Sequence, residues 1–411
     1  MDTSSMDTKG NTGRRRFLTL GGLVLSGTAG CLRLTGSETT PTSTSSGGAQ
    51  SATPPTSTLS TSYPPLEIEL ATEIEFSGTN SSPGTKFAVV DDSRIAAVGG
   101  KNVKIVNTNQ IAVERSVPIP NVSNFGSHGI VSHDGGVYAA VGGSSNAQII
   151  KISPESGEVW RFEEEAFGPN VLRNIGGPVI TNSVVAVAVW TTDNREGEAD
   201  GRIYLLDTES GEPIVSPDAL ITENTGSTSQ IAAGAGFVIL RGSDGLYFYD
   251  VAAREYVGNT RGYAGEEMRV RDGILYTGKA AFDVSTREQL WENSGSPASI
   301  GTTIIDDRIY YGTPISCVSL EDGTLRWTYE PNGTVRGVAT AGDGDVWAGT
   351  FRNTKPGYLY RIDAEDGSVL GASEFPPTDD SPISEPYGLI RHGERLFAGS
   401  FDSLVAYDVH S

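Results

Sequence analysis

Residues able to perform acid–base or nucleophilic chemistry are few and scattered along this chain of 411 residues. The four histidines are His128, His133, His392 and His410. His133 and His392 fall in the turn-like stretches SHDG and RHGE, where we interpret them as solvated turn residues. The chain contains no G-x-S-x-G, H-E-x-x-H or Walker sequence. The sequence therefore predicts no catalytic residue.

The sequence also argues against a metal site. Two cysteines, Cys31 and Cys317, are too few for a disulfide framework or a Cys-rich metal site. The stretch TTDNREGEADG (191–201) resembles a calcium loop in part, but its spacing matches no EF-hand. We interpret it as a long exposed hairpin, and we predict no metal ligands.

A second group of residues is suited to binding. Stepping back nine residues from the start of the second strand in each of the eight repeats described below selects one ring of positions. The ring contains Lys86, His128, Gly176, Ser229, Glu266, Ile300, Gly337 and Tyr387, with Arg173 and Arg336 close by. One interpretation is a polar lining of a wet channel. The other is a site for a small anionic or sugar-like ligand, because guanidinium forks and aromatic faces suit those groups. The predicted binding residues are Lys86, His128, Arg173, Glu266, Arg336 and Tyr387.

The elements that must position this ring are strands of one motif repeated between residues 66 and 411. Its clearest copies are IYLLDTESGEPIV (203–215), CVSLEDGTLRWTY (317–329) and LYRIDAEDGSVLG (359–371). The residues at the aspartate position of the motif are Asn107, Ser153, Asp207, Asp250, Asp283, Ser319, Asp363 and Asp408. Their mean spacing of about 43 residues matches four strands per repeat.

The motif has a direct physical meaning. Alternating apolar positions place one face of each strand against a neighbouring repeat. Asp-x-x-x-Gly turns supply carboxylate caps and a glycine with positive φ where the chain reverses. Trp160, Trp291 and Trp327 follow the aspartate position at similar offsets, and we expect each to lie flat against the next repeat.

Eight aspartate positions predict an all-β, eight-bladed β-propeller of four-stranded antiparallel blades. The last copy ends at Ser411, after its third strand. Residues 66–76, LEIELATEIEF, alternate as a strand does, and we expect them to supply the missing outer strand and to close the ring. Closure removes open sheet edges that invite aggregation.

The motif resembles the repeat of pyrroloquinoline-quinone-type (PQQ-like) propellers, which reads roughly L-x-A-L-D-x-x-T-G-x-x-x-W. LLDTESGEPIV, VSLEDGTLRW and RIDAEDGSVLG carry this pattern. The resemblance implies the fold of about 340 residues. It is weak for function, because propellers with this repeat include quinoprotein dehydrogenases and non-catalytic assembly scaffolds.

The N-terminal region reads as an export signal followed by a linker. Residues 14–31, RRRFLTLGGLVLSGTAGC, resemble a twin-arginine signal of the haloarchaeal lipoprotein type, with an apolar stretch too short to span a bilayer. Thr28-Ala29-Gly30-Cys31 resembles a lipobox, so we predict a lipid on Cys31; ordinary signal cleavage is the alternative. Seventeen of the 28 residues in 35–62 are Ser or Thr, which predicts a disordered stalk. The predicted domains are 1–31, 32–63 and 64–411.

The charge excludes one class of partner. The formal net charge is −21, and seven of the 30 basic residues are lysine. An acidic chain does not neutralise phosphates, so we expect no nucleic acid partner. The acid-rich, lysine-poor composition resembles that of halophilic proteins, although an acidic surface also favours solubility alone.

These observations predict a monomeric, non-catalytic propeller anchored by lipid to the extracellular face of the cell membrane. It would bind an envelope protein or a small anionic or sugar-like ligand at the channel, with no cofactor. The alternative is a quinoprotein-type dehydrogenase that holds PQQ with calcium. The absence of a Cys-Cys pair argues against this alternative, since such enzymes usually place a vicinal disulfide over the quinone.

Overall fold

The computed structural model describes most of the chain that follows residue 62. The described residues are 56–57, 63–76, 84–120, 125–143, 146–164, 173–192, 199–215, 230–241, 245–261, 268–277, 279–293, 303–312, 314–340, 344–351, 357–376, 388–400 and 403–410. The predicted signal sequence, including Cys31, lies outside them. Among the described residues, no helix is long and apolar enough to cross a membrane.

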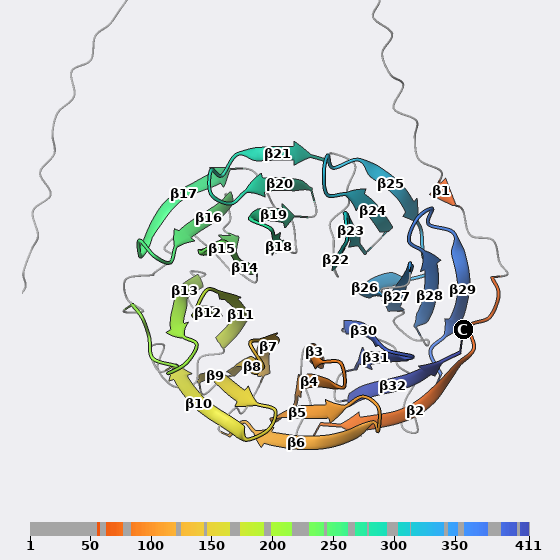
Figure 1. Ribbon diagram of the computed structural model, residues 1–411, viewed down its shortest axis with the longest axis horizontal. Helices are drawn as coiled ribbons and strands as arrows, with labels where there is room; N and C mark the ends of the chain where they lie inside the picture. Colours follow the sequence, from red (N-terminus) through yellow and green to blue (C-terminus); the bar gives the residue numbers. More distant parts are fainter. Residues whose placement is uncertain are drawn as a thin grey trace, which may run out of the picture. The chain divides into compact units, whose positions relative to one another are not determined.

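The described chain folds into a ring of eight antiparallel sheets, which confirms the predicted β-propeller (Figure 1). We number the blades 1 to 8 in the chain order of their innermost strands. These innermost strands are β3 (Lys86–Asp91), β7 (Phe125–His133), β11 (Arg173–Thr181), β14 (Ile231–Gly234), β18 (Met268–Arg271), β22 (Thr303–Ile305), β26 (Thr334–Thr340) and β30 (Gly388–His392). Each is followed by its second strand through a short turn.

The second and third strands of the blades are buried in the body of the ring. The second strands are β4 (Arg94–Gly99), β8 (Gly136–Gly143), β12 (Val184–Thr192), β15 (Phe237–Arg241), β19 (Ile274–Thr277), β23 (Arg308–Tyr311), β27 (Asp345–Phe351) and β31 (Arg395–Gly399). The third strands are β5 (Asn102–Asn107), β9 (Ala147–Ser153), β13 (Ala199–Asp207), β16 (Gly245–Asp250), β20 (Ala280–Asp283), β24 (Ile315–Ser319), β28 (Tyr358–Asp363) and β32 (Ser403–Val409). The aspartate positions of the motif are at or next to the ends of the third strands, as predicted.

The outermost strands form the rim. They are β6 (Ala112–Pro118), β10 (Gly157–Glu164), β17 (Glu255–Arg261), β21 (Gln289–Glu292), β25 (Leu325–Tyr329), β29 (Val369–Glu374) and β2 (Ile68–Glu75). In blade 3, the described part of the outermost strand is a single antiparallel β-bridge between Leu206 and Pro213.

The N-terminal strand closes the ring, as the alternation of residues 66–76 predicted. β2 pairs antiparallel with β32, from Ile68 opposite Val409 to Glu75 opposite Ser403. Figure 1 shows β2, in orange, alongside the blue β32 of the last blade. The sheet order β2-β32-β31-β30 therefore completes blade 8 with a strand from the other end of the propeller.

The described residues of the predicted linker, 56–57 and Tyr63, contact the propeller. β1 (Thr56–Ser57) runs parallel to β25 of blade 6 and adds a fifth strand to that sheet. The ring of Tyr63 meets that of Tyr329 edge-on, with centroids 6.3 Å apart. The remaining residues of 32–63 lie outside the described part, so the linker boundary stays a prediction.

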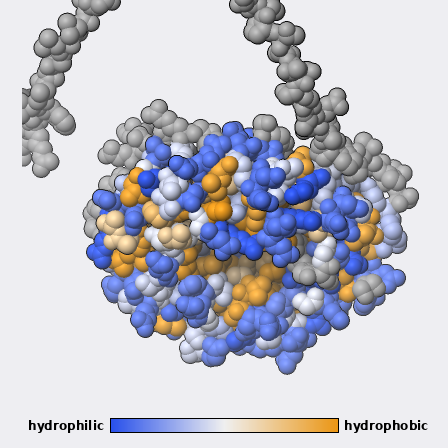
Figure 2. Space-filling model, turned by 45° about the horizontal axis from the view of Figure 1, so that its top comes forward, coloured by the Kyte–Doolittle hydropathy of each residue, from blue (hydrophilic) through white to orange (hydrophobic). Residues whose placement is uncertain are grey.

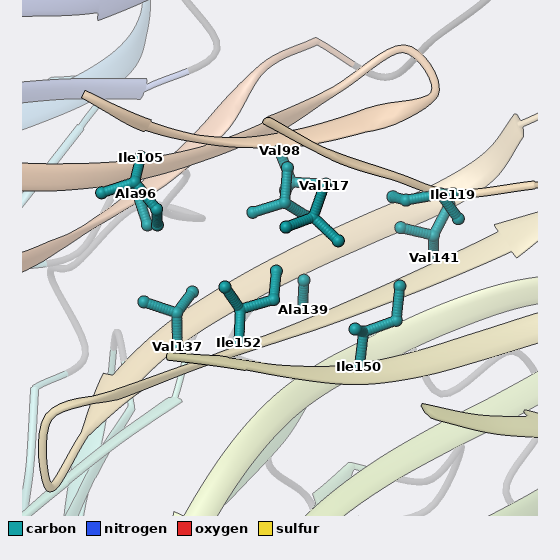
Figure 3. Packing of buried hydrophobic residues seen from close by; sticks show 11 residues of the cluster. Ala96, Val98, Ile105, Val117, Ile119, Val137, Ala139, Val141, Ile150 and Ile152 are labelled. Carbon is teal, nitrogen blue, oxygen red and sulfur yellow. The ribbon is translucent and has the colours of Figure 1, made fainter. Parts of the chain in front are cut away.

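The core consists of eight apolar contacts, one between each pair of neighbouring blades. Between blades 1 and 2, Ala96 and Val98 face Val137 and Ala139 (Figure 3). Alternate residues of the same strands face the other way, so Ile95 packs against blade 8. Because both faces of the middle strands are covered, each fully buried Val or Ile contributes about 1.5–3 kcal/mol.

The predicted tryptophan contacts are present between blades. The indole of Trp327 donates from Nε1 to the carbonyl oxygen of Ala364 in the next blade, at 3.1 Å. Its ring covers Gly367, where an added Cβ would lie 2.6 Å from a ring carbon. Trp160 and Trp291 make the same two contacts, each with the next blade along the chain. Each tryptophan thus holds the turn that follows the third strand of its neighbour.

Where the motif has aspartate, its carboxylate caps the turn. Oδ1 of Asp207 accepts from the backbone N–H of Glu209 and of Ser210, at 3.0 and 2.8 Å. The hydrogen bonds from Ser210 hold the pKa of Asp207 below its usual value. Gly211 follows with a φ of +75°, a backbone conformation that favours glycine.

Candidate functional site

Four of the six predicted binding residues lie on innermost strands, in the first half of each. Lys86 and Arg173 are the first residues of β3 and β11, His128 lies in β7, and Arg336 lies in β26. All innermost strands run in the same sense, because each leads through a turn into its second strand. The backbone therefore brings these four positions to one end of the ring, which we call the channel mouth.

Of the six predicted binding residues, Lys86 alone has a described side-chain burial: it is half-buried, and its backbone pairs opposite Val98 of β4. The side chains of His128, Arg173 and Arg336 lie outside the described residues. The same holds for Glu266 and Tyr387 in full, which precede β18 and β30. The predicted grouping thus stays a prediction for these side chains. Figure 2 shows one face of the propeller, which is hollowed at its centre.

Positive charge is concentrated on the described innermost strands. These strands contain six lysine or arginine residues and one acidic residue, Asp91. The whole chain has 30 basic and 51 acidic residues. Basic residues thus outnumber acidic ones on the innermost strands, whereas acidic residues predominate in the whole chain. The basic residues are Lys86, Arg173, Arg269, Arg271, Arg336 and Arg391. The innermost strands therefore have a net positive charge within an acidic protein.

Three of these arginines, Arg269, Arg271 and Arg391, were missed by the sequence analysis. Arg269 is exposed on β18, and Arg271 of the same strand donates from Nη1 to the carbonyl oxygen of Asp306, at 2.6 Å. The guanidinium of Arg391 lies over the ring of Trp347, 5.4 Å from its centroid. The sequence analysis counted back a fixed nine residues and so tested one position in each blade. Considering every residue of each innermost strand would have included these arginines.

The histidines near the turns differ from each other. His133 is the last residue of β7, and its Nε2 lies 3.3 Å from Oδ2 of the exposed Asp134. This position agrees with a solvated turn residue. His392 is the last residue of β30, and its Nε2 is buried with no hydrogen-bond partner among the described residues. The ring of His392 is half-buried beside the exposed turn residues Gly393 and Glu394, so its interpretation as a solvated turn residue stays a prediction.

Two further observations concern metal ligands and the free thiol in the described part of the chain. There, no group of three or more His, Cys, Asp or Glu residues is arranged to hold a metal ion. Cys317 is fully buried in β24, and burial raises the pKa of its thiol to about 11. Such a thiol is almost entirely protonated at neutral pH and is a poor nucleophile.

The acid-rich stretch 191–201 forms part of a hairpin, as expected. β12 and β13 pair antiparallel as far as Thr192 opposite Ala199, and residues 193–198 between them lie outside the described residues. This pairing accounts for the chain reversal, and the predicted exposure of the tip stays a prediction.

Comparison with known proteins supports the fold. No protein-family model matches the chain, and no curated protein matches it. Among solved structures, the chain is similar to BamB from Moraxella catarrhalis, with a TM-score of 0.55 and 16% sequence identity, over 84% of this chain and 99% of that chain. The computationally designed Ika8 protein aligns with a TM-score of 0.43 and 11% identity, over 82% of this chain and 98% of that chain. The likeness to BamB is one of fold.

Proposed function

We propose that this protein is a non-catalytic binding protein whose propeller holds a small anionic or sugar-like ligand, or an envelope protein partner, at the channel mouth. The observation that carries the proposal is the excess of basic residues on the innermost strands of an otherwise acidic chain. An anion is repelled by the acidic surroundings and attracted by these residues, of which Lys86, Arg173 and Arg336 lie at the channel mouth.

The chemistry of the basic residues fits such ligands. A guanidinium binds a carboxylate or sulfate through two parallel hydrogen bonds, and a lysine adds a point charge with three donors. Arg173, Arg336 and Lys86 come from three different blades, so a bound anion would contact separate parts of the ring.

We place the protein on the extracellular face of the cell membrane. This part of the proposal rests on residues 14–31, with their paired arginines, short apolar stretch and Cys31, and on the Ser/Thr-rich linker that follows. Release of a Cys31→Ser variant from the membrane fraction would support a lipid anchor, and its retention after a salt wash would count against one.

A titration tests the binding site. D-Glucuronate, which is both anionic and a sugar, serves as the probe in calorimetry with the wild type and with Lys86→Ala and Arg336→Ala variants. A hydrogen bond to a charged group contributes about 1.5–3 kcal/mol. Each variant should therefore bind roughly 10- to 100-fold more weakly.

The control is Arg326→Ala, which removes an exposed arginine from the outer strand β25 and should leave the affinity unchanged. An equal loss in all three variants would mean that overall charge, and not the channel mouth, governs binding. Failure of glucuronate to bind, together with equal capture of envelope components by wild type and variants, would contradict the proposal. Uptake of PQQ with calcium, seen by absorbance, would instead support the dehydrogenase.

A further inference from the structure

One surface loop carries a sequence motif that the proposed ligand site does not use. Residues 330–333 connect β25, the outermost strand of blade 6, to β26, the innermost strand of blade 7. Asn332-Gly333-Thr334 at the end of this connection has the form Asn-x-Ser/Thr, with no proline in the middle. This tripeptide is the acceptor sequence for N-glycosylation in exported proteins. Because so short a motif also occurs by chance, its value depends on whether the folded protein presents it to solvent.

The folded protein presents all three residues of the motif. Asn332 and Gly333 are exposed in the bend before β26, and Thr334, the first residue of that strand, is exposed as well. The hydrogen bonds described for Asn332 involve its backbone alone. The acceptor amide and the hydroxyl-bearing residue that completes the motif are therefore both at the surface.

The backbone of Asn332 is held by two side chains of blade 7. Its N–H donates to the hydroxyl oxygen of Tyr360 at 2.9 Å. Its carbonyl oxygen accepts from Oγ1 of Thr350 at 3.3 Å. Tyr360 and Thr350 are both buried. Attachment of a group to the side chain of Asn332 would break none of these described hydrogen bonds, so the fold can accommodate it.

The position of the loop follows from the course of the strands. The innermost strands begin at the channel mouth, and β26 begins at Thr334, two residues after Asn332. Arg336, one of the predicted binding residues, follows in the same strand. A group on Asn332 would therefore stand at the end of the ring where the proposed ligand binds.

Two other copies of the motif occur in the sequence, and both are in the same kind of connection. Residues 80–82 (NSS) come between β2 and β3, and residues 121–123 (NVS) come between β6 and β7. Each connection joins the outermost strand of one blade to the innermost strand of the next, as residues 330–333 do. Both tripeptides lie outside the described residues, so Asn332 is the copy whose surroundings are described.

We propose that Asn332 is N-glycosylated. The reaction forms a bond between Nδ2 of Asn332 and the anomeric carbon of a sugar that is carried on a lipid phosphate. The bond from that carbon to the phosphate oxygen breaks, the lipid phosphate leaves with the bonding electron pair, and the amide nitrogen loses one proton. This modification rests on the proposed extracellular location, because the acceptor sequence is used in exported chains.

Mass spectrometry of the mature protein, isolated from the cells that produce it, tests the proposal. The peptide that contains Asn332 should carry the added mass of one or more sugar residues. Asn332→Gln removes the acceptor and Thr334→Ala removes the hydroxyl of the motif, so both variants should lose this mass completely. Thr334→Ser restores a hydroxyl and should keep the mass. Loss in Thr334→Ala together with retention in Thr334→Ser would show that the motif is read, and not merely the shape of the loop.

Asn109 is the matched internal control. It is exposed, and its backbone N–H and carbonyl oxygen are hydrogen-bonded, as those of Asn332 are. Two residues later it has Ile111 instead of a hydroxyl-bearing residue, so its peptide should carry no sugar. Equal modification of both asparagines, or loss of the sugar in Thr334→Ser, would overturn the proposal.

Labelling of intact cells with a reagent that does not cross the membrane separates this proposal from the proposed location. Unmodified Asn332 in protein that is labelled from outside would contradict the glycan and leave the location standing. Unmodified Asn332 in protein that is protected from the label would contradict both. Glucuronate binding measures neither outcome, so the test is also separate from that of the channel mouth.

Discussion

At the scale of single residues, the backbone carbonyl after the third strand is an acceptor that several donor types can use. Trp160, Trp291 and Trp327 reach it through an indole N–H. In blade 1, Arg115 takes the same role: its Nε donates to the carbonyl oxygen of Pro154 at 3.2 Å. The contact between blades is thus kept although the side chain changes from indole to guanidinium.

The contact between tryptophan and glycine leads to a stability prediction. In a Gly367→Ala variant, the new Cβ would lie 2.6 Å from the ring of Trp327, and the residue would keep a φ of +77°. Overpacking costs about 1–3 kcal/mol, in addition to about 1–2 kcal/mol for the left-handed backbone. We expect the free energy of unfolding to fall by the sum of both.

Gly273→Ala is the matched control. Its φ is +76°, and no atom lies within 4 Å of the added Cβ, so it carries the backbone cost alone. Denaturant unfolding of both variants separates the two effects. Equal losses in the two variants would show that the ring of Trp327 moves away at no cost.

At the scale of elements, β-bulges decide which way the outer strands face. Each of the seven described outermost strands is bulged against its third strand. Trp160 and Trp291 directly follow the bulged residues Val159 and Leu290, which are 49% and 50% exposed. Because a shift of one residue turns the following side chains to the opposite face, the bulge directs the indole toward the next blade.

The bulge in β2 gives the closing strand two apolar faces. It lies between Leu70 and Thr72. Before it, Leu66, Ile68 and Leu70 pack against blade 7; after it, Ile74 and Phe76 pack against blade 1. The bulge therefore lets one strand contact both neighbouring blades with apolar side chains.

Deletion of residues 63–76 tests ring closure. Ile74 and Phe76 are 7% and 3% exposed, and each fully buried apolar side chain contributes about 1.5–3 kcal/mol. The loss would remove much of a typical stability of about 5–15 kcal/mol, so we expect a large fall in melting temperature. Phe76→Ala provides a milder change that should still lower it.

The control deletion removes residues 35–55, the Ser/Thr-rich sequence that precedes β1. We expect this variant to melt as the full chain does. Identical melting of the 63–76 deletion and the control would refute closure by the N-terminal strand.

At the scale of the whole molecule, the distribution of charge predicts a dependence on salt. The formal net charge is −21, and the Debye length grows from about 3 Å in 1 M salt to about 10 Å in 0.1 M. Repulsion among carboxylates therefore strengthens as the salt is diluted. We expect the melting temperature to fall between 1 M and 0.1 M salt; a flat or rising value would contradict the halophilic interpretation.

The sequence by itself determined the propeller, its blade count and its closing strand. These features rest on local signals: apolar alternation, aspartate and glycine at turns, and a regular period. The tertiary structure decided the features that depend on contacts between residues far apart in the sequence. The bulges depend on pairing between strands, so the directions of the outer side chains follow from the assembled sheet. Thr108 in blade 1 and His392 in blade 8, far apart in the sequence, line one hollow because the ring closes.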